Sequence, residues 1–302
     1  KNGRVADPGI VGVAPGGTLD ALARQIAQGI SPILKQPVVV ENLAGAGGLV
    51  GFQRLKRSDP DGHTLNFSNM GLLVIPHLHP QGGFDALNDL APVASVATVP
   101  MVLAVSNASG FTDLKSMIEF MRQNPGKVNL GSGGPGTTAH LSQALFLKLA
   151  GAQGELVQYR GTGPALIDVI AGTIQGIIDQ TVTLMPLHAD KRARAIAVSA
   201  PQRVARMPDV PTFAEAGLPQ FDLRIWNGLV APKGTPRATL DRIAAAVSQV
   251  MDSPEYVERV EKQFASEIPS MADRGPDGFR RLMERDATRV ADLVKSIGLQ
   301  GK

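Results

Sequence analysis

A glycine loop between an apolar run and a helical pattern occurs twice in this sequence. Residues 11–20 read VGVAPGGTLD and residues 127–138 read KVNLGSGGPGTT. In each stretch a short β-type run ends in glycines around a proline, and a threonine then opens a helix. A strand that passes through such a loop into a helix presents backbone N–H groups to an anion. The repeat therefore predicts two α/β units, each with one anion-holding loop.

The rest of the chain alternates short strands with longer helices in the same way. Further strands are predicted over 37–40, 64–67, 100–105, 156–159 and 226–231, and further helices over 165–171, 237–251 and 277–297. This alternation favours an α/β fold with largely parallel sheets. The apolar run 100–105 lies between the two units and the run 226–231 follows the second unit, and the chain is expected to cross between the lobes at both.

Composition narrows the possible partners. The chain has 302 residues, enough for about two domains, with 43% hydrophobic and 19% charged residues. Its formal charge is only +3, its basic clusters are short and its aromatic content is 4%, so no nucleic-acid partner is expected. The longest apolar stretch, 93–105, is interrupted by polar residues and proline and is too short for stable membrane insertion. Cysteine is absent, which excludes thiol nucleophiles and thiolate metal sites.

The glycine loops do not match the motifs of nucleotide enzymes. Gly131, Gly133 and Gly136 fit the dinucleotide fingerprint, yet no acidic residue ends the following strand. The same loop resembles a phosphate-binding loop, but Thr137 stands where the lysine of that motif must be. Ser132 is not preceded by the glycine that a nucleophile elbow requires. No catalytic residue is therefore expected.

Histidines and acidic residues give no catalytic or metal-binding cluster either. His77 and His79 lie between prolines and no acidic cluster follows them, which indicates a loop and no metal site. Asp20 lies in the first turn of its helix, where the helix dipole alone favours it. Asp179 interrupts an apolar run at the end of a predicted strand. A carboxylate in that position needs a partner, so it either faces a ligand or bound water or makes a structural hydrogen bond.

Neutral hydrogen-bond donors stand at the starts of two predicted helices. They are Thr18 in the first loop and Ser132, Thr137 and Thr138 in the second. Such residues commonly cap helices. Their occurrence in two matching units favours the capture of an anion without chemistry, cofactor or metal.

Seven motifs in order give the chain a specific resemblance. They are PGGTLDALA (15–23), QPVVVENLAGAGG (36–48), DPDGHTL (59–65), GSGGPGTTAHLS (131–142), YRGTGPALIDVIAG (159–172), PDVPTFAEAGLP (208–219) and WNGLVAPKGTP (226–236). The chain resembles the periplasmic solute receptors of tripartite tricarboxylate transporters, also called the Bug family. It departs from the pattern of that family at Leu43-Ala44 and over 72–80.

The resemblance implies a type II periplasmic-binding-protein fold, with two Rossmann-like lobes around a ligand cleft joined by two hinge strands. The first domain would combine residues 1–100 with 225–302, and the second would be residues 101–224. The implied ligand-binding residues are Ala14, Pro15, Gly16, Gly17, Thr18, Asp20, Asn69, Met70, Ser132, Gly133, Gly134, Thr137, Thr138, Ala139, His140, Tyr159, Arg160, Gly161, Pro164, Ala165 and Asp179.

The expected function is capture of a small organic carboxylate for membrane transporter subunits. The protein would be a monomeric, non-enzymatic periplasmic receptor without cofactor, and the signal peptide is absent from this sequence. Two loops facing each other predict a dicarboxylate, either aliphatic or aromatic such as terephthalate. Two alternatives stay open, an α/β enzyme acting on an anionic or nucleotide substrate and a sensor that presents its ligand to a signalling partner.

Overall fold

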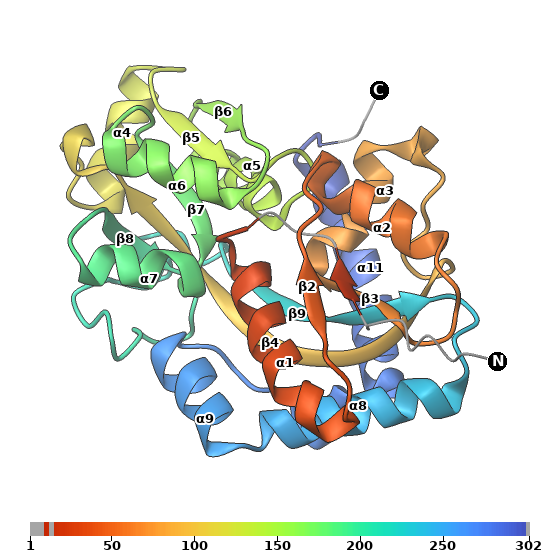
Figure 1. Cartoon of the computed structure of the whole chain (residues 1–302). Coiled ribbons are helices and arrows are strands. Elements are labelled where there is room, and N and C mark those ends of the chain that lie inside the picture. Colours follow the sequence, from red (N-terminus) through yellow and green to blue (C-terminus); the bar gives the residue numbers. More distant parts are fainter. Residues whose placement is uncertain (1–8, 12–14, 300–302) are drawn as a thin grey trace.

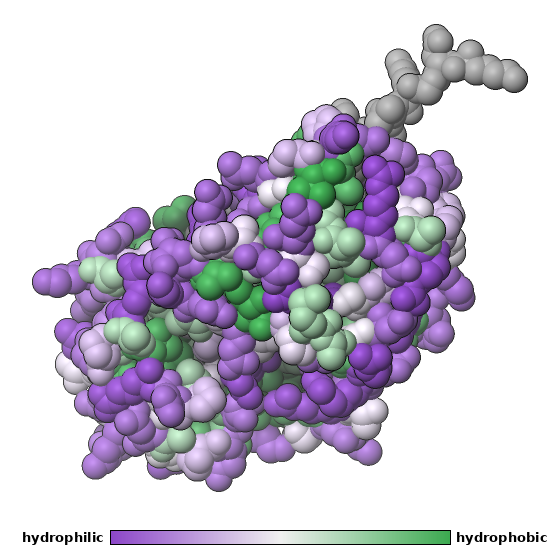
Figure 2. Space-filling view, turned by 90° about the horizontal axis from the view of Figure 1, so that it is seen from below, coloured by the Kyte–Doolittle hydropathy of each residue, from purple (hydrophilic) through white to green (hydrophobic). Residues whose placement is uncertain are grey.

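The structure is a computed structural model that describes residues 9–11 and 15–299. Two lobes of β-sheet and helices lie side by side, and two long strands run between them (Figure 1). On the face seen from below, hydrophilic residues surround separate apolar patches (Figure 2). Among the described residues, no helix is both long and apolar enough to cross a membrane.

The first sheet combines segments from both ends of the chain. Its order is β2 (Val39–Glu41), β1 (Gly9–Val11), β3 (Thr64–Asn69), β9 (Arg224–Pro232) and the first part of β4 (Leu90–Val105). The pairs of β1 with β2 and β3 are parallel, whereas β9 runs antiparallel to both β3 and β4. The glycine loop after β1 and the turn after β3 therefore lie at the same edge.

The second sheet is built on the last residues of β4. It contains β5 (Asn129–Ser132), β6 (Glu155–Gln158), β7 (Gly176–Gln180) and β8 (Arg194–Val198). Strand β4 pairs with β9 as far as Pro100, and from Met101 onward it pairs with β7. One continuous strand of 16 residues thus belongs to both sheets. The domain boundary expected at residues 100 and 101 falls where β4 changes partner, and the division into two domains stays a prediction.

Helices cover both sheets. The first lobe carries α1 (Thr18–Leu34), α2 (Leu49–Lys56), α3 (Ile75–Leu78), α8 (Arg237–Met251), α9 (Pro254–Val257), α10 (Met271–Arg274) and α11 (Pro276–Ser296). The second carries α4 (Leu114–Gln123), α5 (Thr138–Ala150), α6 (Thr162–Ala171) and α7 (Thr181–Ala189). Leu22, Ile26 and Ile30 of α1 are fully buried at a spacing of one helical turn. This spacing holds α1 against α8, so that its first residue points toward the other lobe.

The α/β class and the two lobes agree with the sequence prediction, but the expected predominance of parallel strands is wrong. Among the described strands, half of the pairings are antiparallel, and all of these involve β4 or β9. The two strands meet across more than a hundred residues, for example at Thr98 and Trp226. Local sequence patterns carry no information about such a distant pairing.

Helix α11 packs against β9, the strand at which the chain crosses between the lobes for the second time. The indole of Trp226 in β9 is buried, and its Nε1 donates a hydrogen bond to Asp286 of α11 at 2.8 Å. The ring of Phe279 packs edge-on against the indole, with centroids 5.2 Å apart. We predict that Trp226, the one tryptophan in the sequence, reports lobe closure, because it lies where the chain crosses between the lobes.

Candidate functional site

A pocket lies between the lobes at the carboxyl ends of β3 and β7 and beside the loop that follows β5, the edge where open α/β sheets usually bind ligands. The described residues that line it are Gly17, Thr18, Leu19, Ala44, Gly45, Gly47, Gly48, Phe52, Ser68, Asn69, Leu72, Gly133, Thr137, Thr138, Ala139, Gly161, Thr162, Asp179 and Gln180. Both glycine loops predicted from the sequence thus border the same pocket.

Five helices begin at this pocket, namely α1, α2, α5, α6 and α7. In the described structure the N-cap residues of four of them, Gly17, Gly48, Gly161 and Gln180, provide no side-chain hydrogen bond to the helix. Their first-turn N–H groups need other acceptors, since the first turn of a helix leaves its donors without intrahelical partners. The helix dipoles add partial positive charge at the same place. The helix starts therefore contribute partial positive charge to the pocket without a cationic side chain.

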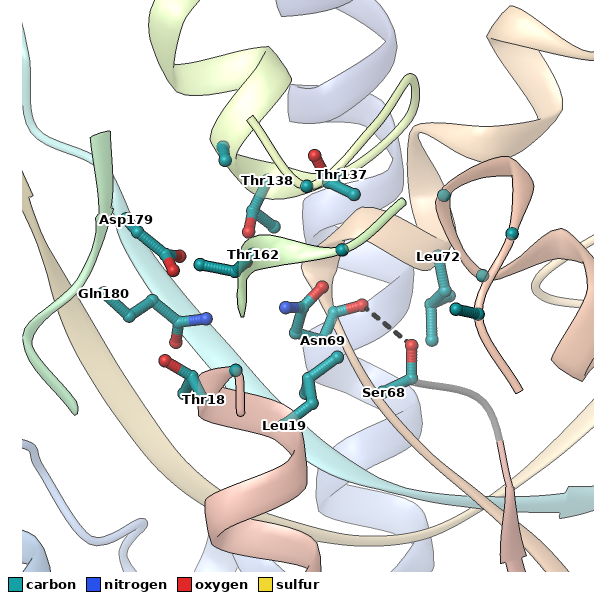
Figure 3. Close-up of a pocket in the computed structure, with 18 of the residues that line it drawn as sticks. Thr18, Leu19, Ser68, Asn69, Leu72, Thr137, Thr138, Thr162, Asp179 and Gln180 are labelled. Carbon is teal, nitrogen blue, oxygen red and sulfur yellow. Dashed lines mark hydrogen bonds between the residues drawn. The ribbon is translucent and has the colours of Figure 1, made fainter. Parts of the chain in front are cut away.

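The hydroxyl of Thr18 has no partner among the described residues. Its Oγ1 is buried and makes no hydrogen bond to residues 9–11 or 15–299, and Thr18 as a whole is 3% exposed. Figure 3 shows this oxygen directed into the pocket from the first turn of α1. An unpaired buried hydroxyl costs about 1–3 kcal/mol, a cost that a bound ligand or water removes.

The polar end of the pocket is formed by the last residues of β7. The carboxamide oxygen of Gln180 accepts a hydrogen bond from Nδ2 of Asn227 at 2.9 Å, which leaves its nitrogen pointing into the pocket (Figure 3). Oδ2 of Asp179 accepts from Oγ1 of Thr183 at 3.0 Å. Burial raises the pKa of Asp179 to about 6, against smaller lowering effects of hydrogen bonds from the Gln180 backbone and the Thr183 and Thr162 hydroxyls.

The opposite end is less polar. Leu72 lies across the pocket from Asp179 and Gln180, next to the loop that leads into α2 (Figure 3). Phe52 and Ala44 are further apolar residues in the lining of the pocket. Among the described lining residues none is lysine, arginine or histidine, so an anion here would be held by neutral donors.

Glycines allow the two lobes to approach closely. A Cβ atom on Gly47 of the first lobe would overlap the carbonyl oxygen of Pro135 in the second. A Cβ atom on Gly163 would lie 3.0 Å from the carbonyl oxygen of Pro15, and one on Gly71 would lie 3.2 Å from that of Gly136. The structure is thus a closed arrangement in which the glycine loops of opposite lobes touch.

The structure brings many of the predicted site residues together. The residues that line the pocket as expected are Gly17, Thr18, Asn69, Gly133, Thr137, Thr138, Ala139, Gly161 and Asp179. Thr137 is the N-cap of α5, with Oγ1 accepting from the backbone N–H of His140, and Thr138 is the first helical residue. Contact of these nine with a ligand stays a prediction.

Other predicted residues of the first lobe do not line the pocket. Asp20 is turned back to its own loop, where its carboxylate accepts from the Gly16 N–H at 3.1 Å and from Asn42 and pairs with Arg24. Met70 is buried in the hydrophobic core of the lobe. Pro15 and Gly16 are exposed, and Ala14 lies outside the described residues.

The second lobe departs from the prediction in a similar way. The hydroxyl of Tyr159 donates to Asp168 at 2.5 Å. Desolvation and, to a smaller extent, the Asp168 carboxylate raise the pKa of Tyr159 to about 12. Arg160 and Pro164 are exposed, and Ala165 is packed in the core of the lobe. Ser132 bonds to Gln158, and neither it nor Gly134 lines the pocket. His140 accepts from the Gly136 N–H, and burial lowers the pKa of its imidazole, which favours the neutral form.

Several lining residues were missed from the sequence. Thr162 and the glycines at 45, 47 and 48 stand inside motifs that were recognised but not assigned to the site. Gln180 directly follows Asp179 at the end of β7, so the predicted strand end could have indicated that Gln180 lies at the site. Leu72 and Ala44 lie where the chain departs from the family pattern.

Fold and pocket together define a two-lobed α/β solute-binding protein, and comparison with known proteins agrees. The family described as "Tripartite tricarboxylate transporter family receptor" matches residues 22–299. The chain belongs to this family, as its motifs predicted. Its members are solute receptors and not enzymes.

The chain is similar to relatives along almost its whole length. It is 38% identical to the "UPF0065 protein in tcbD-tcbE intergenic region" of Pseudomonas sp. (strain P51), over 94% of this chain and 84% of the relative. Among solved structures, MatC from Rhodopseudomonas palustris with bound malate is 30% identical, with a TM-score of 0.91 and coverage of 96% and 99%. Rpa4515 from R. palustris with adipate is 27% identical, with a TM-score of 0.93 and full coverage of both chains.

Proposed function

We propose that this protein is a periplasmic receptor that captures a small dicarboxylate and delivers it to the membrane subunits of a tripartite transporter. The observation that carries the proposal is the convergence of five helix N-termini on a pocket whose described lining residues include no cationic side chain. Hydrogen bonds from oriented backbone amides hold an anion without a formal counter-charge. Without a cationic side chain in its described lining, the pocket makes no ion pair with the ligand. This suits a receptor that must release its ligand to the transporter.

Helix starts at both ends of the pocket support a ligand with two acidic ends. One carboxylate would lie at the polar end, where Thr18, Thr138 and Thr162 start their helices. The other would lie on the Leu72 side, at the N-terminus of α2 after Gly47 and Gly48. The two similar structures with malate and adipate contain dicarboxylates of different length, which supports the same class here.

The test is a matched comparison of acids by isothermal titration calorimetry. Succinate would be compared with butanoate, adipate with hexanoate, and terephthalate with benzoate. Hydrogen bonds to a charged group contribute roughly 1.5–3 kcal/mol each, so we expect at least one diacid to bind about tenfold or more tightly than its monoacid.

The chain length of the diacid that binds best would identify the ligand class. Equal affinities within every pair would show that only one acidic end is held, and the absence of heat with all six acids would contradict carboxylate capture altogether.

A further inference from the structure

Asp179 places a carboxyl group inside a pocket that is otherwise built for anions. Its side chain is 4% exposed, it stands at the end of β7, and Figure 3 shows it pointing toward Thr162 at the start of α6. An ionised carboxylate here would face a ligand carboxylate of the same sign across the pocket. Like charges in such a site favour protonation of one of the two groups.

No charged side chain neutralises Asp179 in the described structure. The titratable groups on the elements packed against β7 are His140 and Lys148 of α5, Asp168 of α6 and His188 of α7. His140 faces Gly136, Lys148 bonds to the carbonyl oxygen of Ser296, Asp168 bonds to Tyr159, and His188 accepts from Ala195 and lies near Asp209. The direct partners of the Asp179 carboxyl are the hydroxyls of Thr183 and Thr162 and the Gln180 backbone.

We infer that Asp179 is a specificity-determining group that is protonated in the complex and donates its hydrogen to the ligand carboxylate, so that the receptor captures an organic acid together with one proton. The inference rests on the proposed function. The proton comes from solvent and stays on Asp179, and no covalent bond forms or breaks. Thr183 and Thr162 hold the carboxyl in place while its O–H faces the ligand.

The direction of the pH dependence follows from the free and bound states. Without ligand, burial already raises the pKa of Asp179 to about 6, and the negative charge of a bound ligand raises it further. Below the free pKa the group is protonated before binding, and affinity is independent of pH. Above the free pKa and below the bound one, a proton must be taken up with the ligand, so affinity falls about tenfold for each pH unit.

The experiment measures the dissociation constant of the best diacid from about pH 6.5 to about pH 8.5, where both ends of the free acid are ionised. We expect the affinity of the unmodified protein to fall roughly a hundredfold over this range. Calorimetry in buffers of different ionisation enthalpy should report an uptake that approaches one proton per ligand. This second measurement needs no variant.

Two variants assign the effect to Asp179. Asp179→Asn keeps the shape of the side chain and supplies an N–H donor at every pH, so we expect binding with little pH dependence and, at the alkaline end, higher affinity than that of the unmodified protein. Asp168→Asn removes a carboxylate of the same lobe that bonds to Tyr159, outside the pocket, and should leave the slope unchanged.

Affinity of the unmodified protein that does not change with pH, or a slope that persists in Asp179→Asn, would overturn the inference while the proposed function stands. Loss of diacid binding at every pH in all proteins would contradict the proposed function as well.

Discussion

Replacing Gly47 by alanine should weaken ligand binding by at least tenfold. The added Cβ atom would overlap the carbonyl oxygen of Pro135 in the opposite lobe, and this overlap exists only when the lobes are closed. A clash that raises the free energy of the closed state by about 1.4 kcal/mol or more reduces the population that can bind by a factor of ten. Titration calorimetry measures the affinity. In the presence of ligand, small-angle scattering should show a larger radius of gyration for Gly47→Ala than for the unmodified protein.

Gly83→Ala is the matched control. Gly47 and Gly83 have nearly the same positive φ, 64° and 60°, so alanine meets similar backbone strain at both positions. A Cβ atom on Gly83, however, would have no neighbour within 4 Å. The control should lose a similar amount of stability and keep its affinity and dimensions. Equal affinities of the two variants would contradict closure through the contact between Gly47 and Pro135.

Replacement of Thr138 by valine should lower affinity and leave stability almost unchanged. Thr138 is 3% exposed, begins α5 and directs its hydroxyl into the pocket (Figure 3). Loss of one hydrogen bond from a buried, partly charged ligand group costs about 1–3 kcal/mol, or roughly five- to 150-fold in affinity. Calorimetry and chemical denaturation on the same protein separate the two effects.

The neighbouring threonine gives the opposite expectation. Oγ1 of Thr137 donates to the carbonyl oxygen of Gly134 at 2.7 Å and accepts from the N–H of His140 at 3.3 Å, so it caps the helix. Thr137→Val should reduce the free energy of unfolding by about 1 kcal/mol and keep most of the affinity. A Thr138→Val variant that loses stability and binds normally would show that Thr138, too, serves only the helix.

Local patterns predicted the elements of this fold well. The apolar spacing over 237–251 gave the bounds of α8, and the glycine loops marked the starts of α1 and α5. Each of these elements is determined by residues near in sequence, such as the one-turn spacing of Leu22 and Ile26. The orientation of β9 against β4 depends on partners such as Thr98 and Trp226, and no local pattern encodes it.

The residues of the candidate site could be predicted where glycine loops and helix starts form it. They were harder to predict where a polar side chain can bond either to the protein or to a ligand. Thr18 and Thr138 follow glycine loops, and a helix start must face the edge of its sheet. Tyr159 belongs to an equally specific motif, yet its hydroxyl bonds to Asp168 in the helix that follows. Asp20 is likewise satisfied by its own loop and by Asn42. Whether a polar side chain reaches the pocket depends on the partners that the fold brings near it.

A crystal structure of the protein with its best-binding diacid tests most directly whether neutral helix starts hold the ligand. One carboxylate should lie within about 3 Å of donors in the first turns of α1, α5 and α6, among them the Thr18 hydroxyl, which has no partner in the described part of the chain. Asp179 should lie within hydrogen-bond distance of the same carboxylate. A ligand bound outside this pocket, or one held by a lysine or arginine side chain, would contradict the proposed site.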